Sequence, residues 1–102
     1  TDIKEYIREH ITEDISLASV AQQFNISAGY LSKFFKENTD ESFSKYMIEQ
    51  KFTYASEALI KFPNRSITDI ANELGYFDSA YFSRQFKAHY GVTPVQYRKM
   101  NH

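Results

Sequence analysis

The chain has 102 residues, which is enough for one compact domain or two very small ones. It contains no cysteine, which excludes disulfide frameworks and thiolate metal sites, and no apolar run approaches the ~18–20 residues of a membrane-spanning helix. The net charge is −1, with two basic and five acidic side chains in residues 1–14 and ten basic and eight acidic ones in residues 15–102, so charge alone does not identify a nucleic-acid binder.

Apolar residues recur at intervals of three and four along almost the whole chain, which has only three glycines and two prolines. This is the period of an α-helix, so we predict an all-α protein of about seven helices. The predicted helices are residues 2–10, 17–24, 28–38, 42–61, 67–74, 79–90 and 94–99. Side chains suited to capping precede four of them, namely Ser16, Ser66, Asp78 and Thr93. The fourth helix would be about 30 Å long at ~1.5 Å per residue, and Pro63 ends it. Its predicted apolar positions are Phe43, Tyr46, Met47, Tyr54, Ala55, Ala58 and Leu59.

The second half of the chain repeats the pattern of the first, with one inserted residue. Residues 17–24 align with residues 67–74, and residues 30–36 align with residues 81–87. Asn25 falls opposite Gly75, and these residue types adopt a left-handed backbone most readily. A helix that ends in such a residue, followed by a short turn and a second capped helix, forms a helix-turn-helix. We therefore predict two such units within one domain, residues 1–41 and 63–102, joined by a linker helix at residues 42–62.

Helical hairpins are common, and their apolar stripes are usually only core. Two copies joined by a long helix, however, would present two similar helices at a fixed separation. Successive major-groove faces of B-DNA lie ~34 Å apart along one side of the duplex, so a helix of about 30 Å is a suitable spacer. The repeat therefore favours DNA binding over a simple helical hairpin.

Residues 71–98, ANELGYFDSAYFSRQFKAHYGVTPVQYR, are similar to the signature of AraC/XylS-type transcriptional regulators, and the first copy follows the same pattern. The resemblance covers residues 5–99. It implies sequence-specific binding of double-stranded DNA by two recognition helices in neighbouring major-groove segments, with regulation of transcription. It also implies contact with RNA polymerase, and a sensing or receiver domain in a longer protein of which this chain is a fragment. Two positions depart from the family: Asp40, where glycine is usual, and Lys51, which lacks the bidentate fork of the usual arginine.

The second helix of each unit is expected to read DNA, with its N-terminal turn facing the base edges. The expected base-contacting residues are Ala28, Gly29, Ser32, Lys33, Ser79, Ala80, Ser83 and Arg84. Arg84 is the strongest candidate because arginine can bond a guanine edge in bidentate fashion, and Lys33 is its counterpart. The others are small, so we expect few direct base contacts and a large contribution of DNA shape. Residues expected to face the interior are Tyr30, Leu31, Phe34, Phe35, Tyr81, Phe82 and Phe86.

Phosphate groups are expected to bind at helix N-termini, where free N–H groups and the helix dipole favour an anion, and at nearby cations. The expected phosphate-contacting residues are Ser16, Ser66, Lys36, Lys87 and Arg98. Because the cations are few, we expect a shallow dependence of DNA affinity on salt.

Two other classes of function were weighed against DNA binding. An enzyme is disfavoured because the three histidines, His10, His89 and His102, form no H-E-x-x-H motif, and neither a phosphate-cradling glycine loop nor a nucleophile–base pair is present. We expect no metal and no cofactor. The other alternative is a helical protein-interaction adaptor that does not bind DNA. Exposed aromatic patches would favour this adaptor, whereas buried aromatic side chains would favour DNA binding. The composition leads us to expect a cytoplasmic protein without membrane contact.

Overall fold

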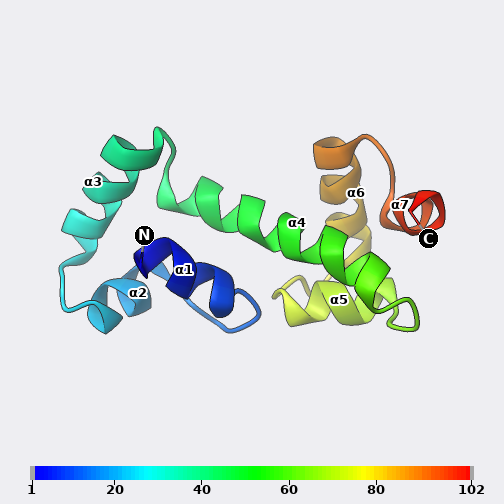
Figure 1. Cartoon of the computed structure of the whole chain (residues 1–102), viewed down its shortest axis with the longest axis horizontal. Coiled ribbons are helices and arrows are strands. Elements are labelled where there is room, and N and C mark those ends of the chain that lie inside the picture. The colour runs from blue at the N-terminus through cyan, green and yellow to red at the C-terminus, as the bar shows by residue number, and fades with distance from the viewer. Residues whose placement is uncertain (1, 102) are drawn as a thin grey trace. The chain divides into compact units, whose positions relative to one another are not determined.

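The computed structural model describes residues 2–101, and this range contains seven helices and no strand (Figure 1). The helices are α1 (Asp2–Glu9), α2 (Leu17–Gln23), α3 (Ala28–Thr39), α4 (Phe43–Lys61), α5 (Ile67–Glu73), α6 (Ser79–Tyr90) and α7 (Pro94–Met100). The predicted all-α class is confirmed, and each predicted helix end lies within one residue of the observed one. Among the helices described, none combines the length and the apolar character that a membrane crossing requires.

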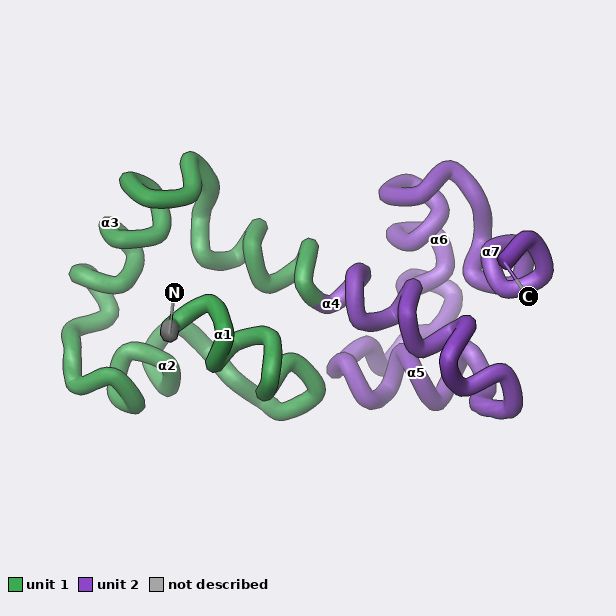
Figure 2. Tube along the Cα trace, in the orientation of Figure 1, with its two compact units in different colours: residues 1–50 green, residues 51–102 purple. Residues whose placement is uncertain are grey.

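The internal packing divides the chain into two compact units, one that ends at Gln50 and one that begins at Lys51 (Figure 2). The boundary lies inside α4. In unit 1 the N-terminal half of α4 buries Phe43, Tyr46 and Met47, and in unit 2 its C-terminal half buries Phe52, Ala55, Ala58 and Leu59. Each half of α4 is thus part of a core, whereas the predicted division set residues 42–62 apart as a linker.

The core of unit 1 is formed by α1, α2, α3 and the first half of α4. Phe35 of α3 is fully buried, and its ring centroid lies 5.3 Å from that of Phe43 and 5.2 Å from that of Tyr46. Ala21 of α2 is also buried, and its small side chain allows α2 and α3 to pack closely. The face of α3 that carries Leu31 and Phe35 is therefore held against the core, which leaves the opposite face in solvent.

The core of unit 2 is built around Phe52 of α4, whose side chain is only 2% exposed. Its ring centroid lies 5.6 Å from that of Phe82, 6.0 Å from Tyr76 and 6.2 Å from Phe86, and its ring stacks on His89 at 5.5 Å. Three of these four partners, Phe82, Phe86 and His89, belong to α6. Aromatic packing between α4 and α6 therefore sets the orientation of α6 within unit 2.

The turn in each helix-turn-helix contains the left-handed residue that the repeat predicted. Asn25 has a φ of 60°, and Gly75 has a φ of 89°. In both units the turn is closed by an equivalent backbone hydrogen bond, from Ile26 N–H to the Ala21 carbonyl at 3.0 Å and from Tyr76 N–H to the Ala71 carbonyl at 2.9 Å. The two units therefore make the same turn with the same geometry.

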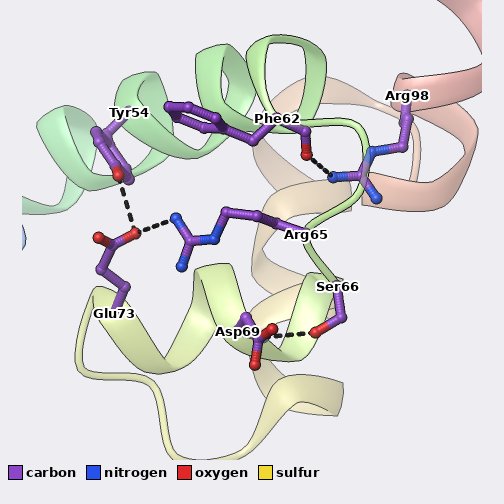
Figure 3. Close-up of polar contacts among 7 residues, drawn as sticks. All are labelled: Tyr54, Phe62, Arg65, Ser66, Asp69, Glu73 and Arg98. Carbon is purple, nitrogen blue, oxygen red and sulfur yellow. Dashed lines mark hydrogen bonds and ion pairs between the residues drawn. The ribbon is translucent and has the colours of Figure 1, made fainter.

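A polar network in unit 2 ties α4 to α5 (Figure 3). The Tyr54 hydroxyl and the Arg65 guanidinium both donate to Oε1 of Glu73, each at 2.8 Å. Burial, followed by the hydrogen bond to Glu73, raises the pKa of the Tyr54 hydroxyl above its ordinary value. In the same region the backbone N–H of Asp69 donates to the Ser66 hydroxyl at 3.0 Å, which caps α5. These contacts fix the first helix of the second helix-turn-helix on α4.

Asp40, at the C-terminal end of α3, is less stabilising than a glycine would be at the same position. Asp40 has a φ of 60° and places a carboxylate at the negative end of the helix dipole, whereas the corresponding end of α6 carries Gly91 with a φ of 82°. We expect Asp40→Gly to raise the free energy of unfolding by about 1 kcal/mol, because it relieves left-handed strain and removes the unfavourable charge. Urea unfolding followed by circular dichroism measures this gain.

The variant Asp40→Asn separates the two causes, because asparagine and aspartate tolerate the left-handed conformation to a similar degree, so that only the charge is removed. It should recover only the dipole contribution of about 0.3–1 kcal/mol. An Asp40→Gly protein that is less stable than the parent would contradict the argument.

Candidate nucleic-acid interface

The second helix of each unit, α3 or α6, begins at a side-chain cap. The Ser27 hydroxyl accepts a hydrogen bond from the backbone N–H of Tyr30 at 3.0 Å. At α6, one carboxylate oxygen of Asp78 accepts from the N–H of Ala80 at 2.9 Å and from that of Tyr81 at 3.2 Å. These caps hold the first turn of each helix, which is the part of a recognition helix that contacts base edges.

The predicted base-contacting residues lie on the outer parts of these two helices. Five of the eight are exposed: Gly29, Ser32, Lys33, Ala80 and Arg84. The other three, Ala28, Ser79 and Ser83, are half-buried. The buried faces carry Leu31 and Phe35 on α3, and Phe82 and Phe86 on α6. Each helix therefore combines an apolar face held in its own core with an outer face of small residues and two exposed cations, Lys33 and Lys36 on α3 and Arg84 and Lys87 on α6.

The prediction that Tyr30 and Tyr81 face the interior is wrong, because Tyr30 is 60% exposed and Tyr81 is 46% exposed. The buried stripe of each helix consists of positions four residues apart, and the residue just before such a position lies about 100° away around the helix axis. The tyrosines therefore lie beside the reading face. The Arg84 guanidinium carbon lies 5.9 Å from the centroid of the Tyr81 ring, so Tyr81 forms a cation–π contact with the strongest candidate base reader.

The predicted phosphate-contacting residues occupy two kinds of position. Lys36 and Lys87 are exposed on α3 and α6. The hydroxyls of Ser16 and Ser66 cap α2 and α5, accepting from the backbone N–H groups of Ser19 and Asp69. Each of these four residues therefore lies on or at the start of a helix of a helix-turn-helix.

Arg98, the fifth of these residues, is instead turned toward the end of α4. Its Nε donates to the Leu59 carbonyl at 2.8 Å, and a terminal nitrogen donates to the Phe62 carbonyl at 3.2 Å (Figure 3). Carbonyls in the last turn of a helix have no partner within the helix. The guanidinium of Arg98 supplies that partner for the Leu59 carbonyl and also bonds the carbonyl of Phe62 just after the helix, so it fastens α7 to the end of α4.

Net charge differs strongly between the two units. Residues 1–50 carry five basic and nine acidic side chains, a charge of −4, whereas residues 51–102 carry seven basic and four acidic ones, a charge of +3. The sum is −1, the charge of the whole chain. The weak positive excess noted from the sequence is therefore concentrated in unit 2.

One exposed residue near the site was absent from the expected set. Phe77 lies in the turn between α5 and α6 and is 97% exposed, directly before the cap residue Asp78. It is also the residue that the second repeat adds to the first. This insertion was visible in the alignment, but its exposure depends on how the turn is packed.

Most aromatic side chains serve the two cores. Of the seventeen Phe and Tyr residues, four are exposed: Tyr30, Phe62, Phe77 and Tyr81. Three of these four lie on α3 or α6 or in the turn before α6. The exposed aromatic area is thus next to the candidate reading faces, where aromatic side chains can contact nucleic acid as well as protein.

Two further polar features, the His10–Glu13 pair and Lys51, lie outside the candidate reading faces. His10 Nδ1 lies 2.6 Å from a carboxylate oxygen of Glu13, an exposed pair close to the end of α1. Within residues 2–101, no group of three or more histidine, aspartate and glutamate side chains is arranged to hold a metal ion. Lys51, at the position where the family usually has arginine, lies 5.5 Å from the centroid of the Tyr76 ring and contributes a cation–π contact to unit 2.

Comparison with known proteins gives a consistent result. A family described as a helix-turn-helix domain matches residues 20–100. The chain is 33% identical over 94 residues to the regulatory protein SoxS of Salmonella typhimurium, and the match covers 92% of this chain and 87% of SoxS. It spans only 31–35% of the length of the first three curated relatives that it matches.

Two solved structures are similar over nearly the whole chain. The C-terminal domain of AraT, a response regulator from Geobacillus stearothermophilus, has a TM-score of 0.84 and 35% identity, with coverage of 97% of this chain and 82% of that one. A transcriptional regulator from Chromobacterium violaceum, described among AraC-type DNA-binding domain-containing proteins, has a TM-score of 0.88 and 24% identity, with coverage of 97% and 88%. At 24% identity, the likeness to the regulator from Chromobacterium violaceum shows a shared fold only.

Proposed function

The chain belongs to the AraC-type helix-turn-helix family of transcriptional regulators, and on this premise we propose that α3 and α6 each enter a major-groove segment of double-stranded DNA and read its sequence. The observation that supports this most directly is the shared design of the two helices. Each has a buried apolar face, a capped first turn, and an outer face of small residues with two exposed cations. Small residues let the helix backbone approach the base edges, and the first cation of each helix, Lys33 or Arg84, reaches beyond them.

Arg84 is proposed as the main base reader, with Lys33 as its counterpart in unit 1. A guanidinium can donate two parallel hydrogen bonds to O6 and N7 of guanine, whereas a lysine makes a less exacting contact. The remaining base-edge contacts are assigned to short side chains: Ala28, Gly29, Ser32, Ser79, Ala80 and Ser83. They can touch a thymine methyl group or make a single hydrogen bond, so DNA shape contributes much of the selectivity.

Phosphate contacts are assigned to Lys36 and Lys87, with Ser16 and Ser66 at the starts of α2 and α5. Arg98 is omitted from this set, because its guanidinium already serves the carbonyls at the end of α4. The positive charge of unit 2 and the negative charge of unit 1 make unit 2 the stronger anchor on DNA, since phosphate neutralisation dominates affinity.

The whole protein is proposed to extend beyond this chain. The first three curated relatives are about three times as long, although SoxS is not, and AraT is a response regulator in which the similar part is the C-terminal domain. We therefore expect a sensing or receiver domain in the full protein, contact with RNA polymerase at promoters, and a location in the cytoplasm, where bacterial DNA lies.

Selection of bound duplexes from random DNA tests this proposal. A shared sequence should emerge, and fluorescence anisotropy should show tighter binding to that duplex than to a scrambled duplex of the same composition. If no sequence is enriched, or if the two duplexes bind equally, sequence-specific DNA binding by this chain is disproved.

The salt dependence of binding is expected to be shallow. Neutralisation of about two to four phosphates gives a slope of log affinity against log salt of roughly −2 to −4. Anisotropy titrations on the selected duplex at several salt concentrations measure this slope, with Lys87→Ala expected to reduce its magnitude by about 1. A slope near −10 would show many more phosphate contacts than the exposed cations of α3 and α6 provide.

A further inference from the structure

Phe77 is the most exposed large apolar side chain among the described residues. It is 97% exposed, and none of the ring–ring or cation–π contacts in the described part of the chain involves it. An apolar ring of this size gains nothing from facing water, since burying it against another surface is favourable. Its position therefore calls for a reason other than packing within unit 2.

The turn itself does not need Phe77. In unit 1 a single residue, Ile26, lies between the left-handed Asn25 and the cap residue Ser27. In unit 2 two residues, Tyr76 and Phe77, lie between Gly75 and Asp78. The hydrogen bond that closes the turn is made by Ile26 in one unit and by Tyr76 in the other, so the turn is already complete before Phe77. Phe77 is thus an added residue that the shared turn geometry does not require.

Phe77 lies at the end of α6 that the proposed function places toward the bases. It directly precedes Asp78, whose carboxylate is engaged by the N–H groups of Ala80 and Tyr81. The neighbouring side chains in the first turn, Ser79 and Ala80, are short. A protruding apolar ring here extends the reach of the first turn of α6. It can make an apolar contact with DNA, which the charged guanidinium of Arg84 does not provide.

We infer that Phe77 packs against the C5-methyl group of a thymine at the edge of the major-groove segment entered by α6, and so sets a preference for thymine at that position. This inference rests on the proposed function. The thymine methyl is the apolar group that base pairs present in the major groove, and phenylalanine is one of the side chains that contact it.

Replacement of thymine by uracil tests the inference, because it removes the methyl group and leaves the base pairing unchanged. Each thymine of the selected duplex is replaced in turn by deoxyuridine, and affinities are measured by anisotropy. At one position the wild-type affinity should fall about fourfold, the factor for one buried methyl group. Phe77→Ala should bind the unmodified duplex more weakly by a similar factor and be insensitive to uracil at that position.

Two variants serve as controls. Phe77→Leu keeps an apolar side chain and should retain most of the sensitivity to uracil. Phe62→Ala removes an exposed phenylalanine that follows α4 and should leave both affinity and the uracil profile unchanged.

The outcomes separate the inference from the function on which it rests. If the wild-type chain binds no duplex selectively, the proposed function fails. If it binds selectively but Phe77→Ala has the same affinity and the same uracil profile, only the inference is overturned. A uniform loss in Phe77→Ala with no uracil-sensitive position would indicate contact with the sugar–phosphate backbone, and unchanged DNA binding with reduced transcription by RNA polymerase would indicate a protein partner. Either of these results also overturns the inference.

Discussion

Replacing Phe52 by alanine should lower the free energy of unfolding by about 3–5 kcal/mol, the range for removing a fully buried phenylalanine. The ring contacts Tyr76 of the turn and Phe82, Phe86 and His89 of α6, so its loss leaves a cavity at the centre of unit 2. Because the chain has two compact units, unfolding is best followed by two probes, circular dichroism and tyrosine fluorescence, in urea. The loss of stability should appear in the unfolding transition of unit 2.

Phe77→Ala is the matched control for Phe52→Ala, since it removes the same side chain from an exposed position of the same unit. Its effect on the free energy of unfolding should stay within about 0.5 kcal/mol. The same measurement establishes that the Phe77→Ala protein is folded when its DNA binding is compared with wild type. A loss below about 1 kcal/mol for Phe52→Ala would mean that α6 does not depend on this ring for its position.

Arg84→Ala should weaken binding to the selected duplex by about 1–3 kcal/mol, which is roughly 5- to 150-fold in affinity. The reason is the loss of the proposed bidentate contact with one guanine, for which the cation–π contact with the Tyr81 ring helps to position the guanidinium. The variant should also lose discrimination at that base pair, so that a change from G·C to A·T there costs little further affinity. Competition anisotropy with single base-pair substitutions measures both effects.

Two cation variants sharpen this experiment. Arg84→Lys keeps the charge, and hence the salt slope, but should not restore discrimination, because an ammonium lacks the planar fork. Lys33→Ala makes the corresponding change in unit 1 and should cost less than Arg84→Ala. An Arg84→Ala protein that loses the same factor on every duplex, scrambled DNA included, would assign this residue to a phosphate rather than to a base.

The ends of the helices could be predicted because the signals that set them are local. Ser16, Ser66, Asp78 and Thr93 cap helices as expected, since each side-chain oxygen accepts from backbone N–H groups two or three residues further along the chain. The left-handed positions at Asn25 and Gly75 were predictable for the same reason, because they depend on the steric properties of single residues.

The core of α4 was predicted less well. The expected apolar positions were Phe43, Tyr46, Met47, Tyr54, Ala55, Ala58 and Leu59, a set that omits Phe52 and includes Tyr54. In the structure Phe52 is the centre of unit 2, and Tyr54 is half-buried with its hydroxyl on Glu73. The buried positions stop at Met47 and resume at Phe52, a step of five residues that a single helical stripe does not contain. The step arises because each half of α4 packs in a different unit.

The sequence by itself determined the all-α class, the helix ends, the repeated helix-turn-helix and the outward cations of α3 and α6, because caps, turn residues and helical periodicity act over a few residues. Only the tertiary structure decided that α4 is shared between two cores, that Tyr30 and Tyr81 lie in solvent, that Arg98 serves the end of α4, and that Phe77 protrudes beside the reading helix. Each of these depends on which surfaces meet when helices distant in the chain pack together, and apolar or charged character alone does not specify the partner.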